Sequence, residues 1–368
     1  MNKYPEENFS PTLSQAAFNY LKEQLNTVCI NVPGSLLHAG VERRDAFLNT
    51  WNSTMKSPGG EVLPVTFLPN PCTPAEIVAD AHLTSLAKCH DTFVSPALRK
   101  AIVAKQLAHI SDPEEAKAKA IRLVELLILE HWDMCVELLK FLEFKNCCGM
   151  PATADFAVKH LGLQAVVYPK PGFLFYLAYP EDQHGNMLVG LLDALRTKLT
   201  RTACTESHCR AYAYLCQQPD KIGLLLEDDL YIDPRFPDQL SYLLPHLKTK
   251  AWDIVQLGYS VHAERPIVPY NSLLSVAPQG AYGNTAVLVR DPKTILQLLD
   301  AHRQGSGPIL ANDVVLAEAS TLSRFLAAKR LIGPPKGEHL SELVGKAMDY
   351  SRFCWSEAEL NDTCCLKH

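Results

Sequence analysis

Three consecutive carboxylates, Glu227, Asp228 and Asp229, directly follow a short apolar run in the second half of the chain. Adjacent carboxylates repel one another unless a cation neutralises them, and Mg²⁺ and Mn²⁺ prefer oxygen ligands of this kind. A metal ion bound by Asp228 and Asp229 could hold a diphosphate group. The alternative interpretation is a solvated turn between a strand and a loop, because Asp is common in turns.

A second group with possible chemistry is the pair Arg43 and Arg44, which lies in a predicted helix at 42–51 after a predicted strand at 28–32. A basic helix start that follows a strand and a loop can present guanidinium and backbone N–H groups to an anion. The alternative is that these arginines are ordinary surface residues, and we expect this for at least one of them.

The acids need a strand to position them. The apolar run at 222–226 predicts a strand that is buried on both faces of a sheet. Because a buried carboxylate without a partner is very costly, the acids are expected at the carboxyl end of this strand, where the sheet opens. In open α/β sheets, ligands bind at that edge.

Short apolar segments alternate with amphipathic segments along much of the chain. Strands alternating with helices predict an α/β fold with a mostly parallel sheet flanked by helices. The further predicted strands are 61–68, 164–168, 173–179, 252–258 and 284–289. The further predicted helices are 10–25, 73–89, 112–147, 152–160, 182–198, 202–216, 237–247, 293–302 and 312–328.

An almost wholly helical block interrupts this alternation. We therefore predict an N-terminal part of the α/β domain at 1–94, a helical insertion at 95–163, the remainder of the domain at 164–335 and a C-terminal tail at 336–368. The insertion could cover a substrate or form a dimerisation surface, and the sequence leaves both open.

Composition excludes several classes of function. The chain has 368 residues, a net charge of −5 and a sequence pI of about 6.2, which gives no support for a nucleic-acid partner. Its one mildly basic cluster, Lys117, Lys119 and Arg122, is predicted to be a solvated helix face. The glycine-rich fingerprints of dinucleotide-binding and P-loop proteins and the Gly-x-Ser-x-Gly elbow are all absent from the sequence.

Compartment is predicted from targeting signals and cysteines. The first residues show no basic region followed by an apolar core, and no apolar run reaches the roughly 18 residues of a membrane span. The 12 cysteines form no Cys-x-x-Cys pair, so a zinc ribbon is not expected. We expect a cytoplasmic protein with reduced cysteines and no transmembrane segment.

Three segments follow one another in the second half of the chain: Thr-Ala-Cys-Thr-Glu-Ser-His at 202–208, Leu-Leu-Leu-Glu-Asp-Asp at 224–229 and Trp-Asp-Ile-Val-Gln-Leu-Gly at 252–258. In this order they resemble glycosyltransferase family 25, which holds bacterial lipopolysaccharide galactosyltransferases and collagen galactosyltransferases. The segment at 283–289 is similar to a later strand of the family, and Asn31 with Arg43 or Arg44 is similar to its opening motif. The resemblance covers about residues 200–315, with a weaker match at 28–45.

The resemblance implies a GT-A-like fold and transfer of a hexose, galactose or glucose, with inversion. The implied donor is a nucleotide sugar, expected to be UDP-linked, and the implied acceptor is a glycan or another hydroxyl compound. The implied cofactor is Mn²⁺ or Mg²⁺, with Asp228 and Asp229 as its ligands. The implied donor-binding residues are Asn31, Arg43, Arg44, Ser207, His208, Glu227 and Asp228.

An inverting transfer needs a base to take the proton of the acceptor hydroxyl. Our candidate is Asp313, at a predicted junction between a loop and a helix, and the alternative for this residue is a helix N-cap. His208 could equally be a histidine that packs within its helix layer.

Two other functions stay open. Val287 and Arg290 depart from the family pattern, which suggests a relative that binds a nucleotide sugar or a glycan without turnover. A weaker possibility is a metal-dependent phosphohydrolase that uses the same acids.

Overall fold

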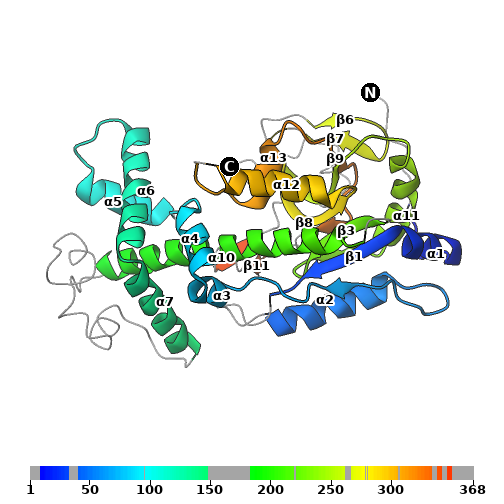
Figure 1. The fold of residues 1–368 in the computed structure, drawn as a ribbon, viewed down its shortest axis with the longest axis horizontal. Helices are drawn as coiled ribbons and strands as arrows, with labels where there is room; N and C mark the ends of the chain where they lie inside the picture. Colours follow the sequence, from blue (N-terminus) through cyan, green and yellow to red (C-terminus); the bar gives the residue numbers. More distant parts are fainter. Residues whose placement is uncertain are drawn as a thin grey trace. The chain divides into compact units, whose positions relative to one another are not determined.

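The computed structural model describes residues 9–32, 40–94, 96–147, 183–218, 221–261, 267–277, 279, 281–305, 307–333, 338–341 and 346–349 (Figure 1). The chain divides into two compact units. The sheet unit comprises Met1–Thr73, Ala203–Ser341 and Lys346–His368, and the helical unit comprises Pro74–Thr202 and Glu342–Gly345. The domain limits proposed from the sequence stay predictions.

The sheet unit is built on an eight-stranded sheet in the order β2-β1-β3-β8-β5-β9-β7-β6. Its strands are β1 (Leu25–Ile30), β2 (Thr66–Phe67), β3 (Ile222–Glu227), β5 (Ile254–Val261), β6 (Val268–Pro269), β7 (Leu274–Val276), β8 (Ala281–Val289) and β9 (Arg324–Ala327). Two further pairs lie outside this sheet: β4 (Tyr231–Ile232) with β10 (Ile332–Gly333), and β11 (Glu338–Ser341) with β12 (Lys346–Asp349).

The sheet is mixed, so the prediction of a mostly parallel sheet is wrong. Strand β1 is parallel to β2 and β3, and β5 is parallel to β9. Strand β8 is antiparallel to both β3 and β5, and β7 is antiparallel to β6 and β9. A parallel neighbour needs a long crossover, usually a helix. The described residues between β5 and β8 instead form the short pair β6–β7, and β8 returns beside β5 in the opposite direction.

Strand β3 is the buried strand predicted from the apolar run. Leu224, Leu225 and Leu226 have no exposed surface. A side chain at Gly223 would place its Cβ only 2.8 Å from the Leu215 side chain, so the helix before the strand packs closely on it. Strand β3 ends at Glu227, which confirms that the acids stand at its carboxyl end.

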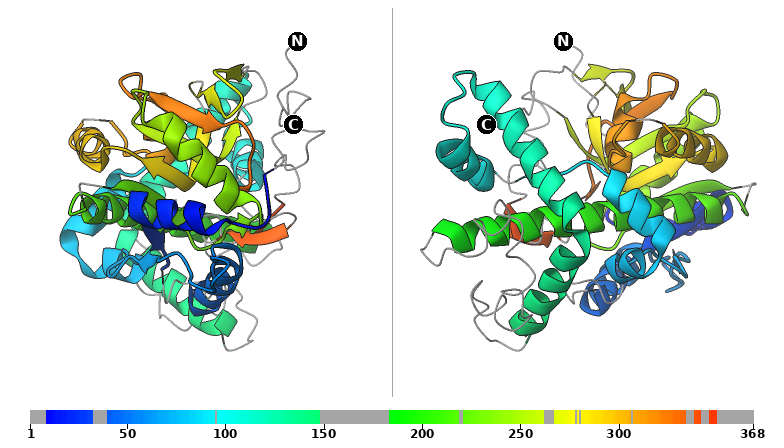
Figure 2. Two further views of the ribbon diagram at one scale, coloured as in Figure 1. Left: turned by 90° about the vertical axis from the view of Figure 1, so that its right-hand side faces the viewer. Right: turned by 60° about the vertical axis from the view of Figure 1, so that its left-hand side comes forward.

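Helices cover both faces of the sheet (Figure 2). Successive strand side chains point to opposite faces. Leu224 and Leu226 therefore pack with α1 (Gln15–Gln24), α2 (Gly40–Thr54) and α11 (Phe236–Leu247). Leu225 packs on the other face with the end of α10 (Gln183–Leu215) and with α12 (Pro292–Arg303) and α13 (Asn312–Glu318).

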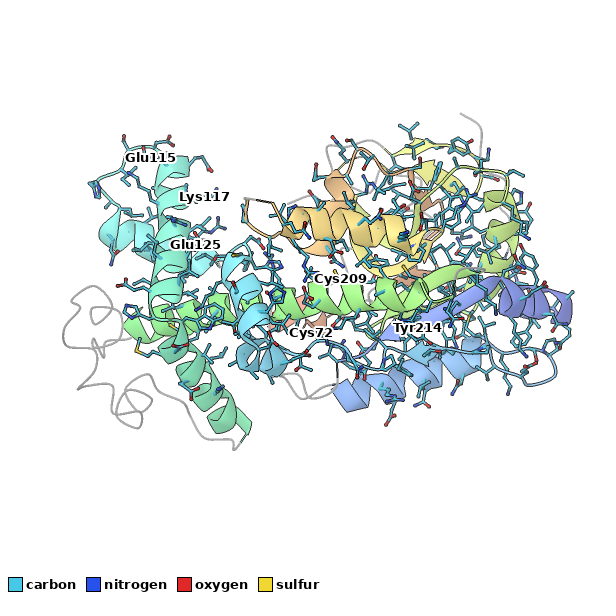
Figure 3. The ribbon with its side chains drawn as sticks, viewed as in Figure 1. Cys72, Glu115, Lys117, Glu125, Cys209 and Tyr214 are labelled. Carbon is cyan, nitrogen blue, oxygen red and sulfur yellow. The ribbon has the colours of Figure 1, made fainter. Side chains whose placement is uncertain are left out.

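The helical unit contains α3 (Pro74–Ala79), α4 (Ala81–Cys89), α5 (Pro96–Gln106), α6 (Pro113–Glu130), α7 (Trp132–Cys147) and the first part of α10. Asp112 caps α6 and accepts a hydrogen bond from the backbone N–H of Glu114. The single helix predicted at 112–147 is two helices, because α6 ends with His131 as its C-cap and α7 begins at Trp132. The basic residues of α6 lie on an exposed face, where each pairs with a glutamate of the same helix (Figure 3). In the part of the chain that the structure describes, no helix combines the length and the apolar character needed to cross a membrane.

Several predicted elements differ from the observed ones. The predicted helices at 182–198 and 202–216 are one continuous helix, α10, of 33 residues. Its threonines do not interrupt it, because the Thr200 and Thr202 hydroxyls donate to backbone carbonyls four residues earlier, at 2.9 and 2.8 Å. The predicted helix at 73–89 is interrupted at Asp80, which caps α4.

A predicted helix and a predicted strand are shorter in the structure than the sequence indicates. The predicted helix at 312–328 ends at Glu318, since Arg324–Ala327 is strand β9 and pairs with β5. The predicted strand at 61–68 is reduced to Thr66–Phe67. The predicted strands at 164–168 and 173–179 and the predicted helix at 152–160 lie outside the described residues.

The close approach of β5 and β10 yields a stability prediction. A Cβ added at Gly258 would lie 2.8 Å from the Gly333 Cα and 3.0 Å from the Ile332 carbonyl oxygen, both backbone atoms. Gly258→Ala should lower the free energy of unfolding by about 1–3 kcal/mol, the usual effect of overpacking. Gly307→Ala is the matched control, because nothing lies within 4 Å of its added Cβ. Equal urea midpoints for the two variants would contradict this account of the β5–β10 contact.

Candidate functional site

The acids meet the end of strand β1 at one edge of the sheet. The register pairs Ile30 with Glu227, so Asn31 follows its strand beside Asp228. The Asn31 side-chain amide donates to one Asp228 carboxylate oxygen, and the Arg43 guanidinium donates to the other. The structure therefore brings together Asn31, Arg43 and Asp228, three of the residues predicted for the site.

Asp228 is held inside the protein by these two donors. Its side chain is only 2% exposed, against 18% for Arg43. Burial raises the pKa of Asp228, and the Arg43 guanidinium opposes that change. Both carboxylate oxygens already accept protein hydrogen bonds, so the role of Asp228 as a metal ligand stays a prediction. In this structure the residue joins β1, β3 and α2.

We call Asp228 with its two donors, Asn31 and Arg43, the Asp228 clamp. Glu227 and Asp229 flank Asp228 in the sequence and are more exposed to solvent than it is. The Glu227 side chain is 25% exposed, and Asp229 is partly exposed. Burial raises the pKa of Glu227 well above its usual range, and the negative charges of Asp229, Asp228 and Asp313 raise it further. A divalent cation would relieve this repulsion. The carboxylate oxygens present are the donor set that a hard cation such as Mg²⁺ or Mn²⁺ prefers.

Asp313 joins the same group of charges from a separate part of the chain. It is the second residue of α13, and its carboxylate accepts the backbone N–H of Val314 at 2.9 Å. The alternative of a helix N-cap is wrong, because Ala311 occupies that position. Its charge acts on Glu227 and its side chain is partly exposed, so a role as a base remains compatible with its position.

The two arginines predicted to bind phosphate point to different surroundings. Arg43 reaches Asp228, as described above. The Arg44 guanidinium instead lies 4.4 Å from the centre of the Phe67 ring, and Arg44 is exposed. The surface interpretation of one of the two arginines therefore fits Arg44, while Arg43 belongs to the acid cluster.

The predicted donor-binding residues of α10 occupy two different positions. The Ser207 hydroxyl has no exposed surface and bonds to the backbone of Cys72, accepting from its N–H at 2.9 Å. It fastens α10 to the segment after β2. His208 is also buried, but its Nε2 lies 3.4 Å from a carboxylate oxygen of Glu227. The structure therefore places His208, and not Ser207, against the acids.

Cys204 is a residue of this region that was not predicted as a site residue. Its sulfur lies 3.6 Å from His208 Nδ1, one helical turn further along. The spacing Cys-x-x-x-His was visible in the sequence, since residues i and i+4 share one face of a helix.

A hollow in the surface lies elsewhere in the sheet unit. Its volume is about 370 Å³, and residues from β7, β9 and the segment between α13 and β9 line it. None of the four acids is among its lining residues. The candidate site is therefore defined by its charged side chains rather than by this hollow.

The Asp228 clamp predicts unequal effects for the two arginines. Removal of one partner of a buried ion pair costs about 3–5 kcal/mol, and proton uptake by Asp228 would reduce that value. Arg43→Met should therefore lower the free energy of unfolding at neutral pH by about 2–4 kcal/mol. Arg44→Met, the matched control, removes only an exposed cation–π contact, with an expected loss below about 1 kcal/mol. Denaturant titration of both variants measures the difference, and equal losses would contradict the clamp.

Glu227 predicts a dependence of stability on pH. Its pKa is raised above the ordinary value of 4.5, so the native state binds this proton more tightly than the unfolded chain does. The free energy of unfolding should therefore fall as pH rises from 4.5 through the raised pKa. Glu227→Gln removes this loss, so its stability relative to wild type should increase across that range.

The measurement is the unfolding free energy from pH 4.5 to 8 without divalent cations, starting at the ordinary pKa of the group. Exposed Glu318→Gln, from the same unit, serves as the control. A difference between Glu227→Gln and wild type that stays constant with pH would show that this carboxyl group is not perturbed by its neighbours.

Comparison with known proteins leaves the family unassigned. No protein-family model matches the chain, and no curated protein matches it significantly. The features that indicate a function are therefore the acids at the end of β3 and the three sequence motifs, which lie in α10, at the end of β3 and in β5.

Proposed function

We propose that this protein is a metal-dependent glycosyltransferase with a GT-A-like fold. It transfers a hexose, with inversion, from a nucleotide sugar that is expected to be UDP-linked to a glycan or another hydroxyl acceptor. The observation that carries the proposal is the group of acids at the open end of β3, with Asn31, Arg43 and Asp313 around it. The order of the three motifs, which resembles glycosyltransferase family 25, supports the same reading.

Asp229 is the metal ligand that fits this arrangement best. It is partly exposed beside Glu227, and the repulsion among these carboxylates favours a bound cation. Mn²⁺ or Mg²⁺ bound there would neutralise the diphosphate leaving group. Asp228 would contribute to this ion only by exchanging a bond with Arg43 or Asn31. Otherwise it would act by holding Arg43 at the site, where the guanidinium can bind a phosphate oxygen.

Asp313 is proposed as the base of the transfer. It approaches the acids from α13, across the sheet from Arg43 of α2. A base has to reach the acceptor hydroxyl within hydrogen-bonding distance, which requires a partly exposed carboxylate. Glu227 would face the ribose of the donor or fix the loop that follows β3.

A second candidate function is binding of a nucleotide sugar or a glycan without turnover. It is favoured by one observation: both oxygens of Asp228 already accept hydrogen bonds from the protein. In that case the acid would serve to connect β1, β3 and α2. A metal-dependent phosphohydrolase using the same acids is the third possibility.

The first test is thermal unfolding with UDP, GDP, CDP and ADP and their sugar conjugates, with and without Mn²⁺. A ligand that binds only the native state stabilises it by about 2.7 kcal/mol at 100 times its Kd. For a unit of this size we expect a rise of roughly 5–10 °C with a UDP compound, and only when Mn²⁺ is present. Asp229→Asn should abolish the rise, while the exposed control Asp45→Asn should keep it.

The second test separates binding from turnover. Asp313→Asn should keep the Mn²⁺-dependent rise and lower sugar transfer or donor hydrolysis by about 10²–10⁴-fold, as expected for a lost base. A rise without sugar release by the wild-type protein would favour the binding function. Release of phosphate from simple esters would favour the phosphohydrolase. No rise with any nucleotide would overturn the proposed donor site.

A further inference from the structure

A second group of potential metal ligands adjoins the acid cluster. Cys204 and His208 lie one turn apart on α10, and Glu227 ends strand β3. One ligand atom from each of these three residues lies within 4.8 Å of the other two. Cys204 and Glu227 are partly exposed, whereas His208 is buried. An ion could therefore reach the group from solvent and find a fixed imidazole.

Hydrogen bonding determines which imidazole nitrogen faces Glu227. His208 Nδ1 lies 2.9 Å from the backbone carbonyl oxygen of Cys204. A carbonyl oxygen only accepts, so the proton of this bond belongs to Nδ1. The nitrogen that faces Glu227 at 3.4 Å is Nε2, which carries the lone pair in the neutral ring. A bond from one ring nitrogen to a backbone carbonyl is how proteins orient a histidine that binds a metal with its other nitrogen.

We propose that Cys204 Sγ, His208 Nε2 and the Glu227 carboxylate bind one transition-metal ion of the Zn²⁺ class. Thiolate, imidazole and carboxylate are the ligands that Zn²⁺ accepts, whereas the acids of β3 alone suit Mg²⁺ or Mn²⁺. Three protein ligands leave the fourth tetrahedral position for water or a substrate oxygen. The site needs no nucleotide, so it stands or falls separately from the proposed transferase.

The geometry requires only a small adjustment. With metal–sulfur bonds of about 2.3 Å and metal–nitrogen or metal–oxygen bonds of about 2.0–2.2 Å, tetrahedral ligands lie about 3.3–3.7 Å apart. His208 Nε2 lies 3.4 Å from a Glu227 carboxylate oxygen, and Cys204 Sγ lies 3.6 Å from the other nitrogen of the same ring, so the sulfur is the ligand that would move most on binding. The continuous backbone of α10 fixes the spacing of Cys204 and His208, and Glu227 follows three buried leucines.

The competing explanation is a shared proton. Glu227, whose pKa is raised by burial and neighbouring acids, could donate its proton to His208 Nε2. The two explanations differ at Cys204, because a shared proton gives its thiol no part, whereas a metal ion binds the thiolate and displaces the thiol proton. A test on Cys204 therefore separates them.

The experiment titrates Co²⁺ into the reduced, metal-free full chain without nucleotide and records the thiolate-to-cobalt absorption band. The wild-type protein should show a band that saturates with one ion per chain and is lost on adding Zn²⁺. In Cys204→Ser this band should disappear, because no thiolate remains in the site. In His208→Gln the Co²⁺ affinity should fall by more than about 100-fold, since loss of a mere supporting partner of a ligand costs about 10–100-fold.

Matched controls are Cys216→Ser, a partly exposed cysteine just beyond α10, and exposed His246→Gln. Both should keep the band and the affinity. Circular dichroism must show that Cys204→Ser is folded, and Cys204→Asp, which retains a ligand without sulfur, should bind Co²⁺ without the band. A wild-type protein with no thiolate band, or a band of equal strength in Cys204→Ser, would overturn the proposal.

Discussion

The sheet unit depends on how Asp228 is neutralised within the protein. This carboxylate lies almost fully buried between the ends of two parallel strands and the first turns of α2. One oxygen accepts from Asn31, which follows β1, and the other accepts from Arg43 of α2. The Asp228 side chain therefore connects the ends of β1 and β3 to α2. Buried charge is tolerated only when it is paired in this way. The same pairing decides where Arg43, the cation of the site, is held.

Electrostatic repulsion among Glu227, Asp229 and Asp313 is a cost in free energy that the fold retains. Burial and three neighbouring carboxylates raise the pKa of Glu227, while the Arg43 guanidinium, which lowers it, is shared with Asp228. Natural proteins retain such repulsion mainly where it serves a site. A hard cation at the carboxylates and a softer one at Cys204 and His208 would each reduce it. Glu227 is the carboxylate that both ions would approach.

Features that depend on neighbouring residues in the sequence, such as the buried strand β3, could be predicted. Features that depend on contacts between distant segments, such as the direction of β8, could not. The apolar run before Glu227 predicts a buried strand with the acids at its carboxyl end, and β3 has both features. The direction of β8 could not be inferred, because its own residues do not say which neighbours it pairs with. Likewise Arg43 and Arg44 are indistinguishable in sequence. Only the fold places one on Asp228 and the other on Phe67. The gap predicted between the helices at 182–198 and 202–216 is absent, because α10 runs through it and the Thr200 and Thr202 hydroxyls bond to carbonyls of the helix itself.

The parallel pairing of β1 with β3 also has a consequence for folding during synthesis. Ile30 pairs with Glu227, although Pro74–Thr202, the larger segment of the helical unit, lies between them in the sequence. At ribosomal rates of about 5–20 residues per second, β1 waits roughly 10–40 s for its partner strand. Until then β1 can pair with β2 but not with β3, so one edge of the strand lacks its partner. The interval exposes an edge that invites association with other chains, so this protein should rely on chaperones more than a protein of equal size with neighbouring strands adjacent in sequence.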